Sequence, residues 1–287
     1  MFRAGPPSGG AVPARLWVSG TGRLAFDEAS DSARDPALRA YMTDMLRPYG
    51  LPLAEEELTS GQSYGEMAGA LLAAEVAAES PVDLLVFAFA TPDVAPWRAT
   101  ASYLSNLCPG RPFAFAVCDQ GVTAPFTALR LILEYARTGG CQRALLVIAE
   151  QAAMPYQPTV PVTTPGKHAV VTLVCDQSGQ GGRLESVRLH PGVTSPEAGR
   201  LLADAIADLS TGHDVIAVVG ASLSALSASL PGQVVSAPAE QPCTGVWWEV
   251  ASAMHGWAAH PARVLLADYD PLIGNLCMAV IEVPGGR

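Results

Sequence analysis

The two halves of the sequence contain the same series of predicted elements. Residues 127–150, TALRLILEYARTGGCQRALLVIAE, read as a helix and then a strand that begins at an arginine, and HAVVTLVC at 168–175 reads as a further strand. The same order returns in WWEVASAMHGWAAHPARVLLADYD at 247–270 and NLCMAVIEV at 275–283. Self-similarity in element order and length indicates an internal repeat. We therefore expect a βαβαβαββ unit that occurs twice, with a shortened second copy.

The remaining segments place this repeat in the α/β class. Residues 82–90, VDLLVFAFA, form a continuous apolar run, which is typical of a strand covered by helices on both faces. Strands that alternate with helices predict parallel βαβ units. We expect the two halves, residues 1–178 and 179–287, to form one compact unit. The expected strands are at 16–19, 82–90, 113–117, 144–149, 167–175, 184–189, 215–219, near Val234, 264–267 and 275–283, and the expected helices are at 36–46, 63–78, 97–107, 124–137, 196–209 and 246–258.

The charge of the chain limits its partners. The formal net charge is -10, and no basic stripe is present that would neutralise a phosphate backbone or an anionic membrane surface. We therefore expect neither nucleic acid nor membrane as a partner. Coenzyme A is itself polyanionic, so a site for it would need a local cluster such as Arg98, Arg111 and Arg143. A carrier-protein partner is slightly favoured over coenzyme A for that reason.

The spacing of the cysteines, and the absence of known metal- and cofactor-binding patterns, predict a reduced protein without a metal. The six cysteines have no CxxC spacing, and we expect them to be reduced and buried, in a cytoplasmic protein. The N-terminal residues lack the apolar core of a signal peptide, and no run reaches the ~20 apolar residues that span a bilayer. HExxH, Walker and GxGxxG patterns are missing from the sequence, so we expect no metal and no bound cofactor.

One turn of the sequence has the form of a nucleophile site. Cys118 follows the predicted strand 113–117, and the turn after it leads into the predicted helix 124–137. A cysteine at a helix N-terminus has its thiolate stabilised by the helix dipole and by free backbone N–H groups, which also stabilise a thioester oxyanion. Asp119, next to the sulfur, acts in the opposite direction and raises the pKa of a thiol.

Duplicated α/β halves with a cysteine at a strand-to-helix turn resemble the thiolase superfamily, and more closely its β-ketoacyl-ACP synthase III-like members. The resemblance rests on the strand-turn-helix around Cys118, on RALLV at 143–147 and on VLLADYDPLIGNLCMAVIEV at 264–283. It covers most of the chain. It implies a five-layered αβαβα fold, with acyl-CoA or acyl carrier protein thioesters as the substrate class.

The same resemblance implies a catalytic set that this chain lacks in part. The family's cysteine falls nearer to Gly121 or Val122 than to Cys118. Its histidine, after the strand at 215–219, is replaced by Gly220 and Ala221, and its asparagine turn is replaced by Gln241-Pro242-Cys243-Thr244-Gly245. Cys118 is therefore either a nucleophile or a structural remnant. The candidate substrate-binding or oxyanion residues are Gly121, Gly220, Cys243, Thr244 and Gly274.

Other chemically capable residues have ordinary structural explanations. The five histidines lie at strand entries or helix ends, where favourable dipole contact accounts for them, and we assign none of them a catalytic role. They are His168, His190, His213, His255 and His260. The pair Trp247-Trp248 either packs in a core or subunit interface or stacks on a ligand.

Three functions remain open. The chain is similar in character to the small, inactive subunit of the heterodimeric condensing enzyme that forms alkylquinolones, which implies pairing with a catalytic homologue as a heterodimer or heterotetramer. The resemblance also implies dimerisation through the strand at 113–117, which a homodimer would share. The alternatives are an autonomous acyltransferase or synthase that is acylated on Cys118, and a small binding module for an acyl ligand.

Overall fold

A computed structural model describes residues 15–75, 80–211, 214–257 and 261–284. One mixed sheet joins all ten strands, in the order β3-β2-β4-β5-β1-β6-β10-β9-β7-β8. The first-half strands are β1 (Leu16–Phe26), β2 (Leu84–Ala88), β3 (Phe113–Val117), β4 (Arg143–Glu150) and β5 (His168–Asp176). The second-half strands are β6 (Gly182–Pro191), β7 (Val215–Val219), β8 (Gln233–Ser236), β9 (Ala262–Asp270) and β10 (Asn275–Val283).

The strand order repeats in the two halves. The first five strands are arranged 3-2-4-5-1, and β6 to β10 follow the same arrangement when each is matched to its counterpart in chain order. The directions agree as well. In each half the second strand is parallel to the third and fourth, and the fifth is antiparallel to the fourth and first. The predicted duplication is confirmed, and β1 and β6 join the halves through three residue pairs.

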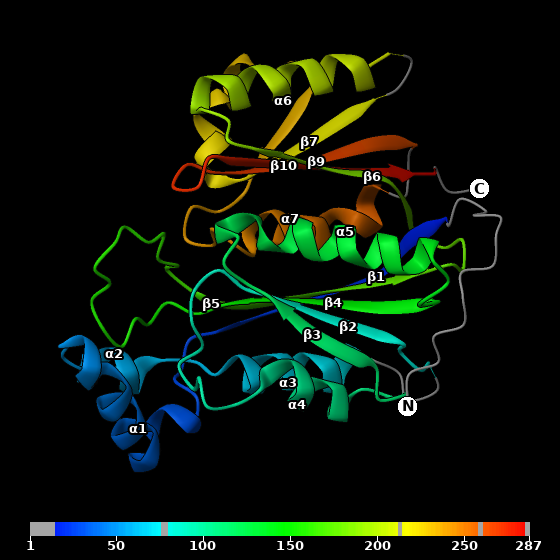
Figure 1. Cartoon of the computed structure of the whole chain (residues 1–287). Helices are drawn as coiled ribbons and strands as arrows, with labels where there is room; N and C mark the ends of the chain where they lie inside the picture. Colours follow the sequence, from blue (N-terminus) through cyan, green and yellow to red (C-terminus); the bar gives the residue numbers. More distant parts are fainter. Residues whose placement is uncertain (1–14, 76–79, 212–213, 258–260, 285–287) are drawn as a thin grey trace.

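The helices divide the molecule into five layers (Figure 1). α5 (Ala124–Arg137) and α7 (Gly245–Trp257) lie between the two half-sheets, α3 (Tyr64–Glu75) and α4 (Thr100–Leu107) cover the first half-sheet, and α6 (Ser195–Leu209) covers the second. α1 (Pro36–Leu46) and α2 (Glu55–Ser60) form a projection beside these layers. The predicted five-layered α/β fold is confirmed. No helix within the described ranges is long and apolar enough to cross a bilayer.

The core explains why α5 and α7 sit between the sheets. α5 carries buried apolar residues at helical spacing, among them Phe126, Leu129 and Leu133, and α7 contributes the fully buried Trp247. The rings of Phe126 and Trp247 lie 4.8 Å apart, between centroids. The two helices therefore share one apolar cluster with the inward faces of both half-sheets, and the N-termini of both helices are fixed by that packing.

The second half is shortened in one connection, as predicted. Between β7 and β8, where the first half has the helix α4, the chain forms the 3₁₀ helix η4 (Ala221–Ser229).

In the first half, β1 extends to Phe26, well beyond the expected end at residue 19, because it pairs antiparallel with β5 over this whole length. The limit between the predicted halves, after residue 178, falls in the loop between β5 and β6.

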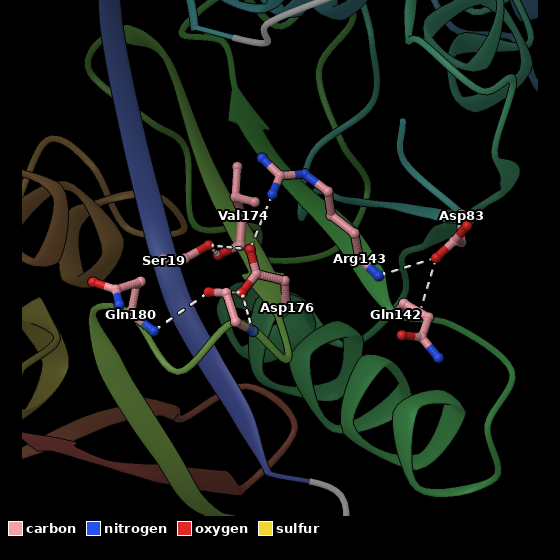
Figure 2. Close-up of polar contacts among 8 residues, drawn as sticks. Ser19, Asp83, Gln142, Arg143, Val174, Asp176 and Gln180 are labelled. Carbon is pink, nitrogen blue, oxygen red and sulfur yellow. Dashed lines mark hydrogen bonds and ion pairs between the residues drawn. The ribbon is translucent and has the colours of Figure 1, made fainter. Parts of the chain in front are cut away.

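A polar cluster fixes the strand ends at the edge opposite the α5 N-terminus (Figure 2). The buried carboxylate of Asp176 accepts hydrogen bonds from Ser19 Oγ at 2.6 Å and Arg143 Nη1 at 3.0 Å, and thereby links β1, β4 and β5. Burial alone would raise the pKa of Asp176, but hydrogen bonds from Ser178 and Ser19 and the charge of Arg143 outweigh it and lower that pKa. Arg143 is thus committed to an ion pair.

Candidate functional site

A threonine caps the N-terminus of α5. Residues 121–123 form the short helix η3, and Thr123 is the N-cap of α5. Cys118 lies five residues earlier, partly exposed, with its sulfur 3.5 Å from Asp119 Oδ2. Partial burial raises the pKa of the Cys118 thiol, and the hydrogen bond to Asp119 and its negative charge raise it further. The structure therefore places Cys118 before the helix N-terminus and in surroundings that disfavour a thiolate.

Thr123 is fully buried, and its hydroxyl has both a donor and an acceptor role. The hydroxyl donates to the backbone oxygen of Gln120 at 2.7 Å and accepts from Asn275 Nδ2 at 2.8 Å. Cys277 is also buried, and burial raises the pKa of its thiol to about 12. The position at which a nucleophile would gain from the helix dipole is thus filled by a closed hydrogen-bonded group.

Asp270 occupies the turn immediately before this helix. Its Oδ2 accepts from the backbone N–H of Val122 at 2.9 Å, and its Oδ1 accepts from that of Leu272 at 2.9 Å. Gly121 has φ +52°, and a Cβ built on it would lie 1.8 Å from Asp270 Oδ2. Gly121, predicted as an oxyanion residue, therefore leaves room for a carboxylate of the protein itself.

The corresponding turn of the second half is arranged in the same way. The carboxylate of Glu150 accepts from the backbone N–H groups of Cys243 at 2.9 Å and Thr244 at 3.2 Å, and from the Thr244 hydroxyl. All three residues are buried at the N-terminus of α7. Burial raises the pKa of Glu150 to about 7, although these hydrogen bonds act against the rise.

The two carboxylates form a reciprocal pair. Glu150 is the last residue of β4 and Asp270 is the last residue of β9, which is the counterpart of β4 in the second half. Glu150 binds the turn before α7, and Asp270 binds the turn before α5. Each half therefore supplies the carboxylate that binds backbone N–H groups of the turn before the other half's central helix.

A third carboxylate, Asp268, lies in the same buried region. A Cβ on Gly220 would lie 1.9 Å from Asp268 Oδ1, so the glycine after β7 is needed for this close approach. Asp268 Oδ1 accepts from the backbone N–H of Tyr269 at 2.8 Å, and Oδ2 is buried with no hydrogen-bond partner among the described residues. Burial, followed by the charges of Asp270 and Glu150, raises the pKa of Asp268 well above its usual value.

These acids determine the chemistry of the nearby thiol. Burial raises the pKa of Cys243 well above its ordinary value, and the negative charges of Glu150, Asp268 and Asp270 raise it further. A site that developed a thiolate or an enolate here would face three acidic groups in a low-dielectric interior. The arrangement supports neutral, hydrogen-bonded packing and opposes the formation of an anion.

The cavity at the mouth of this region is small. Its volume is ≈ 170 Å³, whereas small-molecule sites usually measure about 300–1,000 Å³. It is lined by Gly121, by Asp270 and by loop residues 161–163 and 272–273. Leu272 and Ile273 are half-exposed at its rim. A cavity of this size holds a few atoms and not an extended acyl chain.

The remaining predicted residues lie outside this arrangement. Gly274, with φ +63°, packs against the backbone oxygen of Val193, and its neighbour Asn275 is the residue that contacts Thr123. His168 Nδ1 accepts from the Ala152 backbone N–H at 3.2 Å, and burial lowers its pKa. His190 lies half-buried near the end of β6. His213, His260 and the side chain of His255 lie outside the described residues.

The tryptophans and arginines also have other contacts. Trp247 is a core residue, and the Trp248 ring lies under the guanidinium of Arg23 at 4.7 Å. Arg98 lies over the ring of Tyr103 at 4.8 Å and Arg143 pairs with Asp176. Arg98, Arg111 and Arg143 were expected to form a cluster for an anionic substrate. Two of the three, Arg98 and Arg143, thus contact other groups of the protein.

Sequence reasoning found the two turns but missed the acids that hold them. Thr123, Glu150, Asp268, Asp270 and Asn275 were not predicted as site residues. A signal was present, since Glu150 and Asp270 each end a strongly apolar strand at equivalent places in the repeat. Within the described part of the chain, no three His, Cys, Asp or Glu side chains are placed to hold a metal ion.

The fold is similar to that of solved acyl-condensing enzymes. ChlB3, described as an acyltransferase, superposes with a TM-score of 0.63 at 15% identity over 94% of this chain and 98% of its own. AbyA1, a tetronic acid condensing enzyme, gives 0.64 at 16% identity over 93% and 99%. FabH from Pseudomonas aeruginosa, a 3-oxoacyl-(acyl carrier protein) synthase III, gives 0.61 at 16% identity over 94% and 98%.

These similarities establish the class of fold. The chain has the thiolase-like fold shared by FabH-type synthases and by OleA from Xanthomonas campestris, which gives a TM-score of 0.59 at 13% identity over 93% of this chain and 98% of its own. No family model matches the sequence, and no curated protein matches it. The identities are low, so the likeness concerns architecture, and the function has to be argued from the site.

Proposed function

We propose that this chain is a β-ketoacyl synthase III-like subunit without condensing chemistry of its own, which pairs with a catalytic homologue. The complex would be cytoplasmic and would transfer or condense acyl groups from acyl-CoA or acyl carrier protein in specialised-metabolite biosynthesis. The single observation that carries the proposal is the buried Thr123 hydroxyl, hydrogen-bonded to Asn275, at the N-terminus of α5.

The electrostatics of the site support the loss of chemistry. An acyl-accepting thiol needs a lowered pKa and an oxyanion hole of free N–H groups. Here the N–H groups of Val122, Cys243 and Thr244 donate to carboxylates of the protein, and the pKa values of Cys118 and Cys243 are raised. Groups that would serve an anionic intermediate are thus already engaged by anions.

The open edge of the sheet at β3 supports the proposed pairing with a catalytic homologue. β3 is the terminal strand and hydrogen-bonds to β2 on one side. Phe113, at its start, is 51% exposed, and its ring lies 5.7 Å from that of Phe115 and 6.4 Å from that of Tyr135 on α5. An apolar edge strand left open favours pairing with another chain. A partner strand would extend the sheet and cover these aromatic rings.

The neighbours are consistent with the pathway class. ChlB3 is described as an acyltransferase, and AbyA1 as a tetronic acid condensing enzyme. Both superpose over more than nine tenths of this chain. By this analogy we place the complex in the assembly of a polyketide-like or fatty-acid-like product, with the carrier protein bound mainly by the catalytic subunit.

Co-purification tests the pairing. The tagged chain is co-expressed with each ketosynthase-like homologue encoded near it, and a stable complex is expected with one of them. Phe113→Asp places a charge on the open edge and should abolish the complex, whereas Tyr49→Asp, at an aromatic residue 77% exposed elsewhere, should leave it intact. A well-behaved monomer that binds no such homologue, or a complex indifferent to Phe113→Asp, contradicts the proposal.

A further inference from the structure

A second, larger cavity lies at the other end of α5. It has a volume of ≈ 560 Å³, within the range of ligand sites. Arg137, the last residue of α5, lines it, and Thr123 caps the opposite end of the same helix. At 1.5 Å per residue the two ends are about 20 Å apart. The cavity is therefore separate from the closed turn of the former active-site position.

The outward face of β6 forms one wall of this cavity. Arg188 pairs with Met278 and Ser186 pairs with Val280, so these residues share the outer face of the second half-sheet with the apolar cluster under α6. Paired residues in adjacent strands point to the same side of a sheet. A charged side chain thus lies on this sheet face, whereas the part of the same face that α6 covers carries apolar residues.

The local break in the sheet gives the cavity its opening. The pairing of β1 with β6 ends at Leu16 and Leu184, and the register of β6 against β10 shifts just after Leu184. Beyond this point β6 pairs with β10 on one side. Arg137 of α5 and Arg15, before β1, reach the rim there. The opening therefore lies between elements of both halves.

The cavity is lined by both positively charged and apolar side chains. Four of the chain's 17 basic residues line the cavity, against two acidic residues, Glu185 and Asp208, in a chain of net charge -10. Arg183 pairs with Glu185 at 2.8 Å and also with Glu282, and Arg137 pairs with Glu134 at 2.9 Å. Among the described residues, Arg15 and Arg188 have no ion pair. The apolar part of the lining is Leu133, Leu184, Leu209, Leu265, Met278 and Val280.

We propose that this cavity binds an amphipathic anion, a molecule with a carboxylate or phosphate head and an apolar tail. The head would lie against Arg188 and Arg15, whose guanidinium groups are free to form charge-assisted hydrogen bonds. The tail would lie over Leu265, Met278 and Val280. Free fatty carboxylates have this chemistry. The site is independent of the proposed pairing with a catalytic homologue.

Calorimetry on the full chain tests the binding with separate probes for head and tail. Decanoate carries both, decanol carries the tail alone and inorganic phosphate carries the head alone. We expect decanoate to bind at least about tenfold more tightly than either partial probe.

Variants locate the binding in the cavity. Arg188→Glu should weaken decanoate binding about tenfold or more, whereas Arg130→Glu, at an exposed arginine of α5 outside the cavity, should not. Ala205→Trp fills the cavity from α6 and should block decanoate, with the melting temperature of each variant measured to show that it is folded. Undetectable decanoate binding to the wild type, or equal affinities in Arg188→Glu, Ala205→Trp and wild type, overturns the proposal.

Discussion

Glu150 is a buried acid whose ionisation affects the stability of the fold. Its carboxyl is fully buried, and burial raises its pKa from 4.5 to about 7. Because the folded protein holds this proton more tightly than the unfolded chain, the contribution of Glu150 to the free energy of unfolding falls as pH rises from about 4.5 through about 7. Above that range the contribution is constant.

Glu150→Gln removes this titration and keeps the shape of the side chain. The free energy of unfolding of the wild type, minus that of the variant, should fall by ~3 kcal/mol between about pH 4 and about pH 8. Urea unfolding across this range measures the difference. Glu56→Gln, at an exposed glutamate of α2, is the control and should give a flat difference. A flat difference for Glu150→Gln as well would show that Glu150 is not held in the buried state described.

Cys118 is the second residue with a measurable chemical property. It is partly exposed, and the other five cysteines are buried. Iodoacetamide should therefore label Cys118 first in the folded protein. Because the hydrogen bond to Asp119 and its negative charge help to raise the pKa of the thiol, Asp119→Asn should speed labelling at about pH 8 by roughly two- to fivefold.

The rate is followed by peptide mass spectrometry. Asp31→Asn, at an exposed aspartate before η1 (Ser32–Arg34), serves as the control and should label at the wild-type rate. An Asp119→Asn variant that is no faster than the wild type would remove Asp119 as a suppressor of the thiolate. Labelling of a buried cysteine ahead of Cys118 would contradict the packing.

Among the elements, the turn before α5 depends on a glycine that makes room for a carboxylate. Gly121 and Gly139 both have positive φ, +52° and +72°, but a Cβ meets Asp270 at the first and nothing within 4 Å at the second. Alanine substitutions at these two glycines therefore separate the cost of backbone strain from the cost of a clash with Asp270. Gly139→Ala should cost about 1–2 kcal/mol of stability, from the left-handed backbone alone.

Gly121→Ala should cost at least ~3 kcal/mol, because the carboxylate of Asp270 must leave the N–H group of Val122 as well. Denaturant unfolding of both variants measures the two costs. Equal losses of stability would mean that Asp270 does not fill the turn.

The elements themselves were largely predictable, and the connections between them were not. The expected bounds of α1, α5, β3, β7 and β10 agree with the structure, because apolar periodicity decides each locally. The far end of β1 and the 3₁₀ helix η4 were missed, since long-range pairing and the shortened connection determine them. The acids were missed for the same reason, as Glu150 and Cys243 are 93 residues apart and Val122 and Asp270 are 148 residues apart.

In the molecule as a whole, the duplication places two equivalent turns and two equivalent carboxylates where the halves meet. Each half ends its fourth strand with a carboxylate that binds the central helix of the other half. Hydrogen bonds thus join the two halves at both turns. We propose the edge strand β3 and the arginine-lined cavity as the surfaces for partners and ligands.

Intact mass spectrometry tests the proposal that this chain carries no acyl-accepting nucleophile. The purified chain is incubated with a series of acyl-CoA and acyl carrier protein thioesters of increasing length, beside an active FabH-type synthase as the positive control. We expect adducts on the control and an unchanged mass for this chain. An acyl adduct on the wild type that disappears in Cys118→Ala would contradict it.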